Sequence, residues 1–342
     1  MRIGLEAGQR GREMKRGRIT VLCVTAAIVI AIVVNYALRP REPSYQEKSL
    51  IEWVDLLYTT NHTQAMNSIG AIGPKAIPFL FEKARHWDPA VQRFYRAIWP
   101  KLPAILRQHL PAPKPVDPNF PGKIGNALMA VGQQELPRLI AALEDRDPRV
   151  RHVAVLGIRY MGAKPDAGVP VLCKLLSDPD DRVRGSALPT LGLMGSKAKP
   201  AVPAFIATLR FGTNGHIVGI RATAAWALGQ VGPDAQMAVP WLRQSLSDTN
   251  APMRLSAAIA LWRISQDTNV VSVVIEQFDR NPQNREILRA LGEMGPLAKS
   301  AVPTLLKILG PPDPPWQPYV QPLAREALKK IDPEAAAQAG VK

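Results

Sequence analysis

The chain has 342 residues, of which 46% are apolar but only 6% aromatic, so its core must be aliphatic and rich in alanine. Such a core favours closely packed helices over a β-sandwich. The net charge is +15, with +6 in residues 1–41 and +9 in the rest. The two cysteines, Cys23 and Cys173, exclude a framework of disulfides. Both lie in apolar segments and are interpreted as small core residues.

The first predicted element is an apolar helix near the amino terminus. Residues Ile19 to Val34 contain no charged side chain, and the run extends to Leu38 before Arg39 and Arg41 close it. About 20 residues at ~1.5 Å each match a ~30 Å hydrocarbon core. The run is apolar on every face and lacks a small-x-small cleavage motif. We therefore predict an uncleaved transmembrane signal anchor at residues 19–38, after a basic segment at 1–18.

The orientation of this anchor is predicted from the Lys and Arg residues beside it. Six precede the span, and fewer follow it closely. This bias favours a cytoplasmic amino terminus and an exported carboxy-terminal domain. We thus expect a single-pass protein of a bacterial inner membrane whose remaining chain lies on the periplasmic side. Met14 is a possible alternative start, and the bias shrinks if translation begins there.

After a lead-in helix expected at residues 39–60, prolines mark a repeat at residues 61–335. Short apolar helices open around seven prolines spaced mostly near 33 residues, and Ser272 takes the place of a missing eighth. A period of this length is typical of stacked helical hairpins. The fold is therefore predicted to be an all-α solenoid of about eight helix pairs, with a tail at residues 336–342. The prolines are Pro78, Pro103, Pro137, Pro170, Pro203, Pro240 and Pro303.

Other residues mark the ends and starts of helices at equivalent positions in the repeat units. Gly195, Gly232 and Gly295 are expected to end a helix in the left-handed conformation. The preceding helices are rich in alanine, which allows close approach to a partner. Asp147-Pro148 and Asp178-Pro179 each read as an N-cap followed by a proline in the first helical position. Trp226, Trp241 and Trp262 lie on repeat helices and are interpreted as core.

The repeating string D-x-x-V-R-x-x-A-x-x-x-L-G-x-x-G-x-x-A-x-x-A-V-P-x-L-x-x-x-L resembles HEAT repeats of the phycobilisome-lyase-like type, as found in membrane-anchored bacterial proteins. The match is best over residues 178–209 and 220–246. Residues 45–54, YQEKSLIEWV, resemble the Y-x-G-K-x-L-x-x-W-L lead-in of some bacterial HEAT families, with Glu47 in place of the glycine. The resemblance implies an α-solenoid. By repeat subtype alone it also suggests a lyase or chromophore-handling activity.

The candidate interaction surface is the exposed side of the second helix of each pair, which usually lines the concave face in HEAT arrays. A continuous basic groove there would favour an acidic ligand, and a mixed surface would favour general protein binding. The alternative is ordinary solvated charge. The basic residues on these helices are Lys83, Arg138, Lys174, Arg210, Arg243 and Lys307.

A second set of basic residues recurs seven positions before a leucine or isoleucine. Either these arginines grip an anion or a nucleic-acid backbone, or they belong to the repeat and bond to Asp or carbonyl groups of the adjacent unit. We favour the second interpretation. The set comprises Arg151, Arg184, Arg221 and Arg254.

The sequence contains no P-loop, no HExxH and no cysteine cluster, so no catalytic residue, cofactor or metal ligand is predicted. Our hypothesis is a non-enzymatic, membrane-tethered scaffold or adaptor that binds a protein through the concave face, with an acidic protein as one candidate. The alternatives are a lyase-like or chromophore-handling accessory, and a binder of an anionic ligand through a basic groove. Nucleic acid is not expected as a partner, and no small-molecule substrate is evident.

Overall fold

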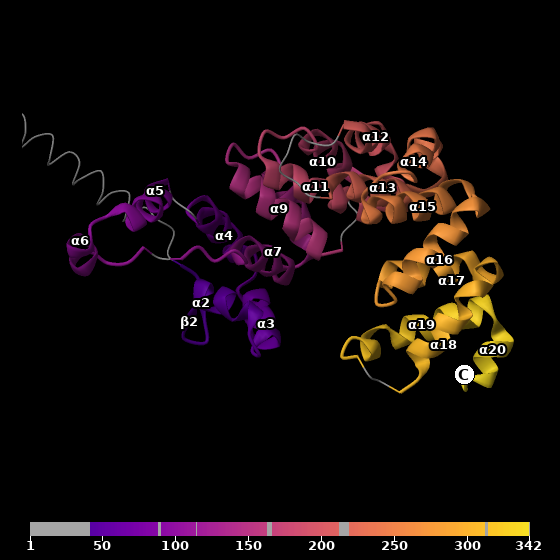
Figure 1. Ribbon diagram of the computed structural model, residues 1–342. Helices are drawn as coiled ribbons and strands as arrows, with labels where there is room; N and C mark the ends of the chain where they lie inside the picture. Colours follow the sequence, from indigo (N-terminus) through magenta and orange to yellow (C-terminus); the bar gives the residue numbers. More distant parts are fainter. Residues whose placement is uncertain are drawn as a thin grey trace, which may run out of the picture.

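The computed structural model describes residues 42–87, 90–113, 115–162, 166–211, 219–311 and 314–341, which form a curved all-α solenoid (Figure 1). The predicted anchor at residues 19–38 lies outside these ranges and stays a prediction. Within them, no helix has the length and apolar character needed to cross a bilayer. The predicted fold class is confirmed for the repeat region.

The lead-in segment begins with a small β-hairpin where we expected one helix over residues 39–60. Strands β1 (Ser44–Tyr45) and β2 (Lys48–Ser49) pair antiparallel, and only then does α2 (Leu50–Asp55) begin. Ser49 and Glu52 form a capping box at the start of α2, which satisfies backbone N–H groups that have no helical partner. The hairpin turn consists of Gln46 and Glu47, both with positive φ.

Glu47 has a φ of 64°, a conformation that costs a residue with a Cβ about 1–2 kcal/mol. It occupies the position where the resembling lead-in carries glycine. We expect Glu47→Gly to raise the free energy of unfolding of this segment by about 0.5–1 kcal/mol, because relief of strain exceeds the added chain entropy. Hydrogen exchange of the α2 amides measures this. A Gln108→Gly control in α6, whose backbone is helical, should show no gain.

The solenoid consists of two rows of helices, because each repeat contributes a first and a second helix. The helices of the first row stack on one another, and four of them carry the V-R-x-x-A motif or a variant with Ile or Met in place of Val. It comprises α3 (His62–Ile72), α7 (Phe120–Val131), α9 (Pro148–Tyr160), α11 (Asp181–Leu193), α13 (Ile220–Val231), α15 (Ala251–Ser265), α17 (Arg285–Met294) and α19 (Gln317–Ile331).

The helices of the second row follow the first-row helices in the chain, and most carry the marker proline in their first turn, where its missing N–H costs nothing. This row comprises α4 (Ala76–Arg85), α8 (Leu136–Ala142), α10 (Val169–Leu175), α12 (Val202–Phe211), α14 (Val239–Ser245), α16 (Val271–Arg280), α18 (Val302–Leu309) and α20 (Pro333–Gln338). Helix α20 continues past residue 335, and its Ala336 is buried, so part of the expected tail belongs to the array.

The predicted second unit, around Pro103, does not join the array. Helices α5 (Ala90–Ile98) and α6 (Ala104–His109) lie to one side of it in Figure 1, and α7 packs on α3 and α4 in their place. No side chain described in residues 92–104 and 106–113 is buried. The proline period therefore identified a helix here correctly but not a stacked repeat.

Turns between the two helices of a unit depend on glycine as predicted. Gly195, Gly232 and Gly295 all have φ between 57° and 76°, a region that favours glycine because it has no Cβ. Each opens a 3₁₀ turn, and these turns span Gly195–Ala201, Gly232–Ala238 and Gly295–Ala301. The turn brings the marker proline to the start of the next helix.

The two rows pack unequally, and this curves the array. A Cβ placed on Gly229 of α13 would lie 2.9 Å from the Cα of Ala260 in α15, so the backbones of these helices nearly touch. Neighbouring second-row helices contact one another little. A row of more closely spaced helices lies on the inner side of a bend. In Figure 1, α10, α12 and α14 accordingly follow the outer edge, and α9, α11, α13 and α15 face the side toward which the array turns.

Candidate binding site

The six basic residues predicted to line the concave face lie instead on the outer row. They belong to α4, α8, α10, α12, α14 and α18, one on each helix. The expectation about their position was wrong because the row that packs most closely, and hence lies inside the bend, is the first-helix row. Whether these six residues contact a partner remains a prediction.

Nor do these six form a continuous cationic surface, since carboxylates or rings accompany most of them. Arg138 pairs with Glu135 at 2.9 Å, Lys174 with Glu144 at 3.4 Å and Arg243 with Asp267 at 3.0 Å. Lys83 lies over the ring of Phe79, Arg210 lies 3.8 Å from the ring centroid of Trp241, and Lys307 is exposed on α18. This mixture of charges favours general protein contacts over a polyanion.

The recurring arginines join neighbouring units, as our favoured interpretation held. Arg151 donates from Nε and Nη2 to the two carboxylate oxygens of Asp178, at 2.7 and 2.8 Å, and from Nη1 to the carbonyl of Asp145. Hydrogen bonds to Asp178 outweigh the burial of the guanidinium and raise the pKa of Arg151. Arg221 reaches Asp248 of the following unit at 2.9 Å.

Arg184 and Arg254 bond to the carbonyls of Asp178 and Asp248 in the loop that precedes each helix. Asp178 is therefore a buried link between units and not the N-cap that we expected. The N-cap of α11 is Asp180, which accepts hydrogen bonds from two backbone N–H groups. The other expected cap, Asp147, is confirmed at the start of α9.

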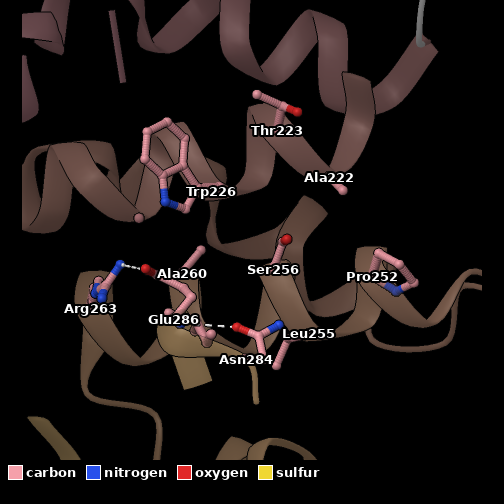
Figure 2. Close-up of a pocket in the computed structure, with 12 residues that line it drawn as sticks. Ala222, Thr223, Trp226, Pro252, Leu255, Ser256, Ala260, Arg263, Asn284 and Glu286 are labelled. Atoms are coloured by element: carbon pink, nitrogen blue, oxygen red, sulfur yellow. Dashed lines mark hydrogen bonds and ion pairs between the residues drawn. The ribbon is translucent and has the colours of Figure 1, made fainter. Parts of the chain in front are cut away.

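A groove opens on the exposed surface of the first row, over α13, α15 and the start of α17. Its volume is about 310 Å³. Every lining residue comes from these first-row segments, so the groove faces away from the second row and lies inside the bend. In Figure 2, Trp226 and Arg263 stand at one end, Pro252 at the other, and Ser256 lies between them. The floor is made of small residues such as Gly229 and Ala260, which pack closely on each other.

Trp226, interpreted as core from the sequence, is a wall of this groove. Its indole lies over Gly192 of α11, where a Cβ would be only 2.4 Å from a ring carbon. Gly192, from the L-G-L-M-G string, therefore makes room for the ring. Trp262 by contrast is buried in the core, as expected. Trp226 remains partly exposed and presents an aromatic edge to the groove.

Arg263 fixes the charged end of the groove. It donates from Nε and Nη2 to both oxygens of Glu293 at 2.8 Å and from Nη1 to Glu286 at 2.7 Å. Burial opposes the charge, but hydrogen bonds to Glu293 and the nearby Glu286 carboxylate outweigh it and raise the pKa of Arg263. With its amide oxygen toward these donors, Gln230 accepts from Arg263 and from the Trp226 indole N–H. The three side chains are thereby pre-oriented.

A second, smaller groove continues along the inner row between α17 and α19. Its sides carry both signs of charge, with Arg289 and Lys330 beside Glu293 and Glu326. Lys330 pairs with Glu326 at 2.8 Å. Together the two grooves offer an apolar slot next to a balanced charged strip. This arrangement suits a polypeptide better than a uniformly charged polymer.

The pKa values of Cys173 and His152 both differ from those of free side chains. Burial raises the pKa of the Cys173 thiol, which disfavours the reactive thiolate. Within the described ranges, no group of three His, Cys, Asp or Glu side chains could hold a metal ion. His152 is partly buried beside Arg182, and burial first and this positive charge second lower its pKa to about 4. Its imidazole is therefore neutral near pH 7, and Nδ1 lies 3.2 Å from the Ser186 hydroxyl.

Comparisons with known proteins agree with this architecture. Residues 136–211 match a family model described as HEAT repeats, and residues 220–248 match one described as a PBS lyase HEAT-like repeat. No curated protein matches the chain.

Several solved structures are similar to the chain at low identity and with TM-scores below 0.5. The complex of CpcE and CpcF of phycocyanin lyase from Nostoc sp. PCC7120 is 18% identical, with a TM-score of 0.46, over 89% of this chain and 96% of that one. Kap121p is 11% identical with a TM-score of 0.46, over 85% of this chain and 34% of that one. An engineered protein is 20% identical with a TM-score of 0.33, over 83% and 96%. The two family models and the stacked helix pairs show that this is a HEAT-repeat protein with PBS lyase HEAT-like repeats.

Proposed function

We propose that this protein is a non-enzymatic scaffold that holds a protein partner in the groove over α13, α15 and α17. The observation that carries the proposal is the groove itself, which combines an aromatic wall at Trp226, a floor of small residues and a fixed ionic cluster at Arg263. Apolar anchors inserted beside pre-oriented polar groups are the usual source of affinity between proteins. The partner is expected to insert an apolar side chain over Ser256.

The scaffold is further proposed to be tethered to a bacterial inner membrane by residues 19–38, with the repeat domain exported. The apolar run and the Lys/Arg bias beside it support this proposal. A tether would confine the groove to partners at the membrane surface. Catalysis by a lyase-like accessory is the competing proposal, and it rests on the repeat subtype alone.

Ser256 allows a direct test of the groove. Its half-exposed side chain lies at the centre of the site, and Ser256→Trp would fill the groove without removing any core side chain. A photo-crosslinking amino acid at position 256 of the full chain, in native membranes, should capture a defined protein. We expect Ser256→Trp to weaken binding of that protein about tenfold or more.

Ala207 provides the matched control, because it is exposed on the outer surface of α12. A crosslinker or a tryptophan at position 207 should have no effect on capture. Equal capture at positions 207 and 256, or none at 256, contradicts the groove as the binding site. An unchanged crosslinking yield when the irradiation is done at raised salt would separate an apolar contact from the alternative of an anionic ligand.

A further inference from the structure

Helices α5 and α6 form a hairpin that the solenoid does not use. Its described side chains are all at least partly exposed, and the ring of Phe94 is 66% exposed. Leu106 and Leu110 are also exposed. In Figure 1 the two helices stand apart from both rows. Phe94, Leu106 and Leu110 are among the ten large hydrophobic side chains that are exposed within the described ranges, so apolar surface is concentrated in this short segment.

The hairpin is amphipathic. Phe94, Tyr95 and Ile98 follow the spacing of one helix face, and Arg93 and Arg96 fall on the opposite one. The Tyr95 ring contacts Trp99 edge-on at a centroid distance of 5.5 Å, so the aromatic residues gather where α5 ends. Prolines at 100 and 103 break the helix there and keep both helices short.

The charged residues of the α5–α6 segment are all basic. Residues 90–116 contain five Lys or Arg and no Asp or Glu. The surface that complements this hairpin must therefore be anionic and must also accept apolar side chains.

We propose that α5 and α6 dock on the surface of a bilayer that contains anionic lipid. Apolar and aromatic residues enter the boundary between headgroups and acyl chains, as Trp and Tyr commonly do. Arg and Lys side chains contact the phosphates, whose negative potential attracts basic segments. An acidic protein with an apolar pocket for Phe94, Leu106 and Leu110 is the competing occupant, and quenching by brominated acyl chains separates the two. The inference is independent of the groove and of what it binds.

A fluorescent label at position 94 tests the docking directly. The full chain would carry Phe94→Cys with Cys23 and Cys173 replaced by alanine, and an environment-sensitive dye on the new thiol. It would be mixed with vesicles of phosphatidylglycerol or of phosphatidylcholine, each containing brominated acyl chains. In phosphatidylglycerol we expect a blue shift and about twofold quenching by bromine, because the label enters the acyl boundary.

Two matched proteins complete the test. A label at Met237→Cys, which is 71% exposed in the turn after α13, should not be quenched in either vesicle. Lys101→Glu with Arg107→Glu should reduce docking to phosphatidylglycerol by about 100-fold or more. The proposal is overturned if the emission wavelength of the dye at position 94 is the same with phosphatidylglycerol vesicles as in water. A blue shift of the dye without quenching by bromine also overturns the proposal, because it indicates that protein and not lipid covers the hairpin.

Discussion

Asp178→Ala is expected to lower the free energy of unfolding of the central repeats by about 3 kcal/mol, because it leaves a half-buried guanidinium without its carboxylate. The Asp178 side chain is 5% exposed and that of Arg151 12%, and two hydrogen bonds join them. Asp178 also accepts from the backbone N–H of Asp180, at the start of α11. The substitution would therefore destabilise the loop before α11 and, through Arg151, the loop before α9.

Hydrogen exchange of the α9, α10 and α11 amides measures this loss locally, which matters because long repeat arrays need not unfold in one step. Asp248→Ala is the matched control. Its partner Arg221 is 43% exposed, so solvent screens the pair and the expected loss is about 1 kcal/mol. Equal losses in the two variants would show that burial of the Arg151 pair contributes nothing.

Gly229→Ala is expected to destabilise the array by about 2–3 kcal/mol through overpacking. The new Cβ would lie 2.9 Å from the Cα of Ala260, and a backbone atom cannot rotate away as a side chain can. Helices α13 and α15 must therefore move apart, which also widens the groove. Thermal unfolding by circular dichroism should show the loss.

Gly292 is the comparison for this effect. It occupies the same position of the L-G-x-x-G motif in α17, but its added Cβ would be 3.4 Å from the Cα of Ala327, an ordinary contact. Alanine also has the higher helix propensity, so Gly292→Ala should be neutral or should stabilise the protein by up to about 1 kcal/mol. Stabilisation by Gly229→Ala as well would refute the idea that close packing of the first row requires glycine there.

Much of the fold follows from local patterns, since proline, glycine and apolar spacing each act within one helix or one turn. That is why the period near 33 residues identified the stacked pairs and why Gly195, Gly232 and Gly295 were assigned correctly. The hairpin at residues 44–49 was missed because its turn holds Gln46 and Glu47, which carry no glycine signal.

Contacts between units were harder to predict. Asp178 looked like an N-cap because Pro179 follows it, yet its carboxylate serves Arg151, 27 residues earlier. The groove was missed for a similar reason. Trp226, Arg263 and Glu293 come from three helices, and no local spacing shows that they meet. The second-helix row was expected on the concave face because second helices usually lie there in HEAT arrays, whereas the closer packing of the first-helix row places that row inside the bend.

The arginine links between units have a consequence for how such a chain changes length. Arg151 and Asp178 are 27 residues apart, and so are Arg221 and Asp248. The repeats that begin with Arg184 and Arg254 have Phe211 and Asn281 at the corresponding position, so the carboxylate link recurs in every second module. Duplication or excision of two modules together would therefore keep the alternation of linked and unlinked arginines. An insertion or deletion within a linked module would separate its arginine from its aspartate.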